Sequence, residues 1–154
     1  MHLFLTMTSN DIKQTYEDLE DKYMEISKQY LGLDESRLGE ALIKHSSTYA
    51  YFASVQSYAK KIKDLKALQL EGSEAVFMER RRKEMTEAGP KPTQGALNSY
   101  ILSVPELVDM RADLLNAENK YNLAKNIVDA LNHQQSMLVQ ISANKRAETK
   151  LHEL

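Results

Sequence analysis

The chain has 154 residues, of which 5 are Gly and 3 are Pro, and its formal net charge is −2. So few turn-forming residues exclude sandwiches, barrels and Rossmann-type folds, because these folds need many turns and positive-φ positions. The chain has no Cys, which excludes a disulfide framework, a thiolate metal site and a cysteine nucleophile. The composition therefore predicts an all-α fold of long antiparallel helices with short flanking helices, which assembles into a helical homo-oligomer.

Residues 1–9 are predicted to form an N-terminal tail, followed by a single helical domain over residues 10–154. The first seven residues, MHLFLTM, are apolar, but they are too short to span a membrane and lack a basic leader. We therefore expect neither a membrane span nor a signal peptide, and the sequence leaves open whether Met1 or Met7 is the start.

The first predicted helix covers about residues 10–31, with Ser9 or Asn10 as its N-cap and Gly32 at its end. Its apolar side chains recur every three or four residues, which is the spacing of a heptad seam. This seam either docks on the next helix of the same chain or forms a coiled coil with another chain. Its members are Ile12, Tyr16, Leu19, Tyr23, Ile26 and Tyr30.

The second predicted helix covers about residues 35–71, beginning near Asp34, and a break is expected at Gly72-Ser73. A further helix follows at 74–87. Residues 88–93 form a linker, because Pro90 and Pro92 are incompatible with a continuous helix.

Two more helices are predicted after the linker, at 94–102 and 104–148. Thr93 is the expected N-cap of the first of them. Ser103 and Glu106 have the spacing of a capping box, with Pro105 in the first turn, which predicts the start of the last helix.

Charge is distributed unevenly along the chain. Residues 1–36 hold 3 basic and 8 acidic side chains, whereas residues 37–92 hold 11 basic and 7 acidic ones. The acidic segment 10–36 either contacts a basic partner or aids solubility. The basic middle points to an anionic partner.

The stretch 60–83 is the strongest candidate site, with 8 basic and 4 acidic side chains. Lysine and arginine neutralise phosphates, and aromatic rings stack on unpaired bases, so the combination favours single-stranded DNA over duplex. The alternative is that the lysines form a solvated face and the tyrosines belong to the core. The candidate residues are Lys60, Lys61, Lys63, Lys66, Arg80, Arg81, Arg82, Lys83 and Tyr58.

Nothing in the sequence predicts catalysis, a metal site or a cofactor. The four histidines are scattered and form no ligand motif. His45 lies on the apolar side of its helix, and we expect it to be a packed, hydrogen-bonded histidine. The acidic group Asp18, Glu20 and Asp21 is expected to be a solvated helix face.

The order of several short motifs resembles the UvsY family of phage recombination mediators. Lys44 to Ser47 (KHSS) precedes a basic stretch that includes Leu65 to Leu68 (LKAL), and Ser103 to Leu107 resembles the opening of the family's final helix. Lys66 matches the lysine of the family's basic DNA-binding segment, whereas Leu68 stands near the position of its arginine. The resemblance covers about residues 34–141.

The resemblance implies an all-helical, non-enzymatic protein that forms a closed ring of about 6–7 subunits in the cytoplasm of a host cell. It also implies binding to single-stranded DNA, and loading of a RecA-like recombinase onto strands covered by single-strand-binding protein. The alternative is a helical phage structural, scaffolding or assembly-chaperone protein that does not bind DNA. Neither the recombinase partner nor the main contact, Lys60–Lys66 or Arg80–Lys83, follows from the sequence.

Overall fold

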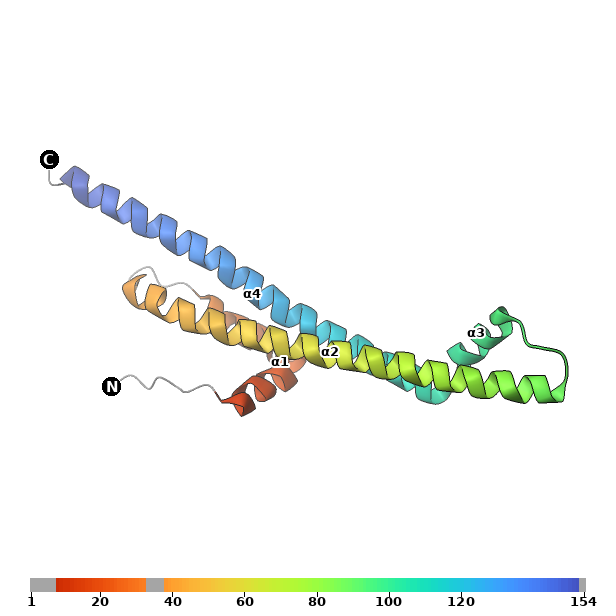
Figure 1. Ribbon diagram of the computed structural model, residues 1–154. Helices are drawn as coiled ribbons and strands as arrows, with labels where there is room; N and C mark the ends of the chain where they lie inside the picture. The colour runs from red at the N-terminus through yellow and green to blue at the C-terminus, as the bar shows by residue number, and fades with distance from the viewer. Residues whose placement is uncertain (1–7, 33–37, 153–154) are drawn as a thin grey trace. The chain divides into compact units, whose positions relative to one another are not determined.

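The computed structural model describes residues 8–32 and 38–152, which form four helices and no strand (Figure 1). The helices are α1 (Ser9–Leu31), α2 (Leu38–Ala88), α3 (Gln94–Ser103) and α4 (Pro105–His152). The predicted all-α class is confirmed, and assembly into a homo-oligomer stays a prediction. Asp34 and residues 1–7 of the expected tail lie outside the described residues.

The start of α1 is fixed by Thr8, one residue before the expected cap. The Thr8 hydroxyl accepts a hydrogen bond from the Asp11 backbone N–H at 3.3 Å, and the Asp11 carboxylate accepts one from the Thr8 backbone N–H at 2.7 Å. This reciprocal capping box satisfies two amides that the first helical turn leaves free. The hydrogen bonds from Thr8 hold the pKa of Asp11 below its usual value.

Helix α2 is continuous through Gly72 and Ser73, which corrects the expected break and joins the segments predicted at 35–71 and 74–87. A glycine inside a helix costs about 1 kcal/mol relative to alanine. Tertiary contacts on both sides of it offset this cost, because Leu70 and Phe77 pack in one hydrophobic cluster. Between them, Glu74 accepts a 2.7 Å hydrogen bond from Arg111 on α4.

The start of α4 differs in detail from the expected capping box of Ser103 and Glu106. The Ser103 hydroxyl donates to the Tyr100 carbonyl at 2.8 Å, in the last turn of α3. The Val104 carbonyl accepts the first α4 hydrogen bonds, from the amides of Leu107 and Val108. Ser103 thus closes α3 rather than opening α4. Thr93, by contrast, caps α3 as expected, and its hydroxyl accepts from the Ala96 amide at 3.2 Å.

The helices divide into two compact units. Unit 1 comprises residues 1–59 and 120–154, and unit 2 comprises residues 60–119. The sequence predicts a single helical domain. In the structure, α2 and α4 are each divided between the two units.

Unit 1 has an aromatic and aliphatic core that α1, the first part of α2 and the second part of α4 build together. Tyr16 and Leu19 of the predicted heptad seam are buried, and the other four seam residues are partly buried. The rings of Tyr30 and Phe52 meet edge-on, with centroids 5.0 Å apart. The seam of α1 therefore packs within its own chain, which decides between the two roles left open for it. The other fully buried members of this core are Val55, Ala59, Ala124, Ile127, Leu131 and Leu138.

Unit 2 has a smaller core at the junction of α2, α3 and α4. It is built around Leu70, Ile101, Val104 and Leu107, and partly buried side chains of α2 and α4 pack against it. α3 lies across this end of the two longer helices (Figure 1). The core of unit 2 thus holds in place the stretch of α2 that carries the candidate basic residues.

Candidate nucleic-acid interface

All eight candidate basic residues lie on the part of α2 that belongs to unit 2. Successive residues of an α-helix are rotated by about 100°, so these side chains are distributed around the helix instead of forming one face. Lys61 lies opposite the buried Leu70, whereas Lys63 and Arg81 lie on the side of α2 that faces the core. The structure therefore does not bring the eight side chains together into a single patch.

The first group of lysines, at 60–66, is largely paired with carboxylates. Lys60 Nζ lies 2.6 Å from Asp64 Oδ2, and Lys63 Nζ lies 3.7 Å from the other oxygen of the same carboxylate. The hydrogen bond from Lys60 lowers the pKa of Asp64. Lys66 Nζ lies 4.0 Å from Asp113 on α4. Phosphate binding by these three lysines therefore competes with carboxylates already in contact.

Two arginines of the second group are similarly engaged. Arg82 Nη1 donates to Glu79 at 2.8 Å, and Arg81 Nη1 donates to Glu84 at 3.3 Å. The Arg81 guanidinium also lies 5.0 Å from the centre of the Tyr100 ring on α3, which is within the range of a cation–π contact. Arg81 is thereby a link between α2 and α3 in unit 2.

The remaining basic side chains are available to a ligand. Among the residues that the structure describes, Lys61 and Arg80 form no ion pair. Lys83 Nζ lies 4.0 Å from Glu79, as far as Lys66 Nζ lies from Asp113, but the Lys83 side chain is 72% exposed and that of Lys66 only 36%, so Lys83 is the more accessible of the two. The guanidinium of Arg80 lies 5.5 Å from the Phe77 ring centre. Helical geometry places Lys61, Arg80 and Lys83 within an arc of about 100°, with about 29 Å along the helix between Lys61 and Arg80. We call these three residues the outer basic stripe.

Tyr58, the aromatic candidate, belongs to unit 1 and is partly buried. Its ring meets the ring of Tyr16 edge-on, with the centroids 5.3 Å apart. Burial, followed by the nearby Glu17 carboxylate, raises the pKa of Tyr16 to about 12. Lys120 Nζ lies 4.6 Å from the centre of the Tyr16 ring and 3.2 Å from Glu17. Tyr58 thus contributes to the packing of α1 in unit 1.

His45 and Asp18 are hydrogen-bonded to other residues of the chain. His45 is buried, and its Nε2 donates to the Leu131 carbonyl of α4 at 2.8 Å, which is the packed and hydrogen-bonded arrangement expected of it. Asp18 accepts hydrogen bonds from Gln14 and Lys22 on the same helix. Within residues 8–32 and 38–152, no three His, Asp or Glu side chains converge in a geometry that fits a metal ion.

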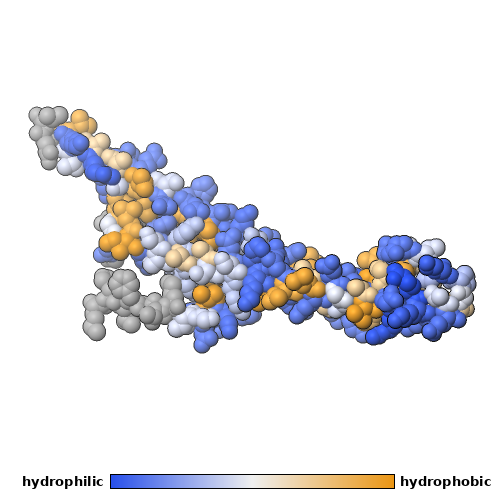
Figure 2. All heavy atoms as spheres, in the orientation of Figure 1, coloured by the Kyte–Doolittle hydropathy of each residue, from blue (hydrophilic) through white to orange (hydrophobic). Residues whose placement is uncertain are grey.

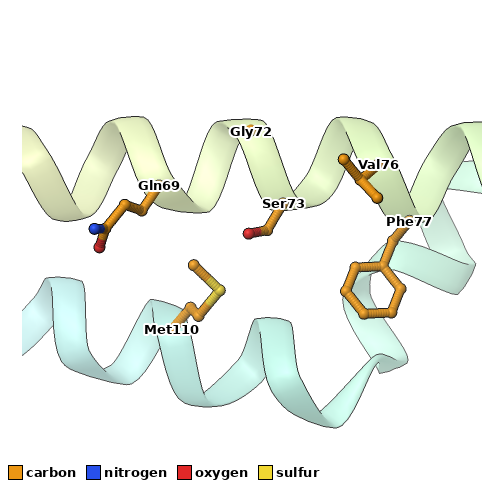
Figure 3. Close-up of a pocket in the computed structure, with 6 residues that line it drawn as sticks. All are labelled: Gln69, Gly72, Ser73, Val76, Phe77 and Met110. Atoms are coloured by element: carbon orange, nitrogen blue, oxygen red, sulfur yellow. The ribbon is translucent and has the colours of Figure 1, made fainter.

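Unit 2 also contains a shallow groove of about 450 Å³ between α2 and α4. Figure 3 shows Ser73 of α2 pointing toward Met110 of α4, with Gln69 at one end of the groove and Val76 and Phe77 at the other. Its lining has no titratable or nucleophilic group other than the Ser73 hydroxyl. The groove therefore fits an apolar group and offers no acid or base for catalysis.

The acidic partners contributed by α4 are the feature that the sequence interpretation missed. The Asp113 carboxylate of α4 lies near Lys66 of α2. In a second pair α4 supplies the cation, because Arg111 contacts Glu74 of α2 at 2.7 Å. Unit 2 as a whole holds 10 basic and 10 acidic side chains, so it is formally neutral. The four acidic residues at 106–118 were a visible signal, but their position against α2 depends on the register of the two helices.

None of the described helices combines the length and the apolar character that are needed to span a membrane. Comparison with protein families, curated proteins and solved structures found no match to this chain.

Proposed function

We propose that this chain is a non-enzymatic recombination mediator that binds single-stranded DNA through the outer basic stripe of α2. In this role it holds a strand otherwise covered by single-strand-binding protein and presents it to a RecA-like recombinase. The proposal rests on the resemblance of residues 34–141 to the UvsY family and on the arrangement of charge on α2.

The observation that carries DNA binding is the stripe formed by Lys61, Arg80 and Lys83. Its members are exposed and lie on one side of a continuous helix. Release of the counterions that phosphates hold makes such contacts favourable at low salt. Because Tyr58 packs on Tyr16, the proposed contact is to the phosphate backbone more than to stacked bases.

Three basic side chains bind weakly on their own, so the proposed mediator acts as an oligomer. A ring of copies would present one stripe per subunit, and a single strand would contact several stripes at once. Binding of one stripe raises the effective concentration of the strand at the next. Wrapping of the strand in this way would loosen the single-strand-binding protein and keep the DNA extended for the recombinase.

The decisive experiment is a fluorescence anisotropy titration of a labelled oligo(dT) strand at several salt concentrations. The variant Lys61→Ala/Arg80→Ala/Lys83→Ala should bind more weakly than the wild type. Each lost phosphate contact on a single strand reduces the slope of log K against log salt by about 0.7, so the slope should fall by about 2. Unchanged affinity and slope in the folded variant would remove the stripe from the site.

The matched control replaces three paired cations, Lys60, Lys66 and Arg82, by alanine. It removes the same charge from the same helix but takes side chains that already contact carboxylates. A smaller loss of affinity than in the stripe variant is expected. An equal or larger loss would place the DNA contact at Lys60, Lys66 and Arg82 instead of at the outer basic stripe.

The second candidate is a helical structural or scaffolding protein that does not bind DNA. The formal neutrality of unit 2 and the carboxylates beside Lys60, Lys63 and Lys66 favour it. Absence of oligo(dT) binding by the wild type at low salt would support this candidate and refute the mediator.

A further inference from the structure

Unit 1 contains a second cavity, a pocket of about 250 Å³ between the end of α1, the start of α2 and the second part of α4. Most of the residues that line it are polar, unlike those of the groove in unit 2. Two of them, Lys44 and His45, belong to the KHSS motif, which the proposed DNA contact does not use. We call this cavity the unit 1 pocket. Its lining includes Glu40, Lys44, His45 and Thr48 of α2 and Gln134 and Leu138 of α4.

The least exposed part of this lining carries uncharged hydrogen-bonding groups beside an apolar side chain. Thr48, His45 and Leu138 are 6%, 8% and 2% exposed. Because the Leu131 carbonyl can only accept, the His45 Nε2 that contacts it at 2.8 Å carries the hydrogen. In the neutral ring, Nδ1 is then an acceptor. The buried end of the unit 1 pocket is therefore polar but uncharged.

The Thr48 hydroxyl has no partner within the chain. A threonine in a helix commonly donates to the carbonyl four residues earlier, but here the Lys44 carbonyl accepts from the Ser47 hydroxyl at 2.9 Å. Over residues 8–32 and 38–152, the Thr48 side chain forms no hydrogen bond. Buried polar groups without partners are rare, because their burial is unfavourable. A ligand in the unit 1 pocket would satisfy this hydroxyl.

The exposed part of the lining carries one charge of each sign. Glu40 and Lys44 have the spacing and the order that favour an ion pair on a helix, and Lys60 and Asp64 pair at the same spacing, at 2.6 Å. In the part of the chain that the structure describes, the side chains of Glu40 and Lys44 nevertheless form no ion pair or hydrogen bond. Both charges are thus available to a ligand.

These features define the chemistry of a ligand. Its buried end is uncharged, because a charge beside neutral groups would be poorly solvated there. Its outer end carries both charges, as an α-amino acid does on a single carbon. The volume equals that of about eight waters at ~30 Å³ each, so the ligand is small. Figure 2 shows apolar and polar side chains intermingled at the end of the molecule where α2 begins.

We propose that the unit 1 pocket binds a free α-amino acid with a carboxamide side chain, of the size of glutamine. The ammonium group contacts Glu40 and the carboxylate contacts Lys44. The carboxamide both donates and accepts, so it pairs with the Thr48 hydroxyl and the His45 Nδ1. Lys44 and Thr48 are one helical turn apart, about 6 Å along α2, which an extended chain of this length spans.

This site lies outside the proposed DNA contact, because the outer basic stripe belongs to unit 2. The bound amino acid would contact α2 and α4 at the same time. A ligand that binds only the folded chain stabilises it. The expected consequence is therefore a unit 1 whose stability responds to the concentration of the amino acid.

The test is thermal unfolding of the full-length chain, together with isothermal titration calorimetry, with L-glutamine as the probe. At a tenfold excess over Kd, the melting temperature should rise by about 3–6 °C. N-acetyl-L-glutamine lacks the ammonium charge, L-glutaminamide lacks the carboxylate, and L-leucine lacks the carboxamide. Each of these three compounds should bind about tenfold or more weakly than L-glutamine.

Variants of the lining locate the site. Thr48→Val keeps the shape of the side chain and should raise Kd about fivefold or more. It should not lower the stability of the unliganded chain, because the hydroxyl has no protein partner, and this separates a binding role from a structural one. Lys44→Met and Glu40→Gln should each raise Kd about tenfold or more. The matched controls Lys125→Met and Glu25→Gln, at exposed positions of unit 1, should bind like the wild type.

Three outcomes would overturn the proposal. They are the absence of both heat and thermal shift with L-glutamine, equal binding of L-leucine or of either analogue, and unchanged Kd in Thr48→Val, Lys44→Met and Glu40→Gln. An oligo(dT) titration of the same samples keeps this result separate from the proposed function, because loss of one binding activity does not require loss of the other. Circular dichroism should show the same helicity for every variant.

Discussion

Replacement of Gly72 by alanine should stabilise the protein. Gly72 lies in the interior of α2, is exposed, and does not have a positive φ. A Cβ built at this position meets nothing within 4 Å, so the substitution adds neither a clash nor a contact, and only the difference in helix propensity changes the free energy of unfolding. The expected gain is that term alone, about 0.8–1.0 kcal/mol. For a chain of this size, such a gain raises the melting temperature by about 2–4 °C.

The assay is thermal unfolding followed by circular dichroism, with Gly32→Ala as the matched control. A Cβ at Gly32 would lie 3.2 Å from the Lys28 carbonyl oxygen, so this substitution should give less than half the gain or a net loss. An unchanged or lower melting temperature for Gly72→Ala would refute a continuous α2. A helix broken at Gly72 in a conformation that favours glycine would lose stability on the same substitution.

Three further predictions concern the cores and their titration. Phe52→Ala removes a fully buried ring and should lower the free energy of unfolding by about 3–5 kcal/mol. Leu102→Ala, at a 67% exposed position, should change it by less than about 0.5 kcal/mol, and urea unfolding of both variants checks the difference. Because burial raises the pKa of Tyr16 to about 12, its contribution to stability is complete below pH 10 and is lost as the pH rises from 10 to 12. In Tyr16→Phe the free energy of unfolding should fall less between pH 10 and 12 than in the wild type. The same pH profile for both proteins would show that Tyr16 does not cause this loss of stability. A double-mutant cycle on Glu74→Gln and Arg111→Met should give a coupling of about 0.5–1 kcal/mol for this partly exposed pair, and a coupling of zero would mean that the pair does not hold α2 on α4.

Most of the helical framework was predictable from the sequence, because long runs of apolar residues at helical spacing dominate it. The linker, predicted at 88–93 and found at 89–93, and the Thr93 cap were equally clear, since Pro90 and Pro92 exclude the helix and a threonine precedes its resumption. The predicted break at Gly72 was wrong for an energetic reason. The local cost of one glycine is about 1 kcal/mol, and the packing of Leu70 and Phe77 on either side outweighs it.

The candidate site was less predictable than the fold. Helical periodicity alone could have shown that the eight basic residues of 60–83 surround α2 and that Lys61 and Lys83 share a side. The pairing of Lys66 with Asp113 could not be foreseen, because it depends on the register of α2 against a segment almost fifty residues away. The same holds for Arg111 and Glu74. Basic side chains that contribute equally to the net charge thus differ in whether a carboxylate lies beside them.

The division of unit 1 into two stretches of chain has a consequence for biosynthesis. Residues 60–119 are contiguous, so unit 2 can fold while the C-terminal residues are still inside the ribosome. Unit 1 has to wait for the second part of α4, which supplies Ala124, Ile127, Leu131 and Leu138 to its core. A premature stop codon before residue 120 would therefore leave α1 and the start of α2 with an exposed apolar surface, and such a truncated product should be a substrate for cellular proteases.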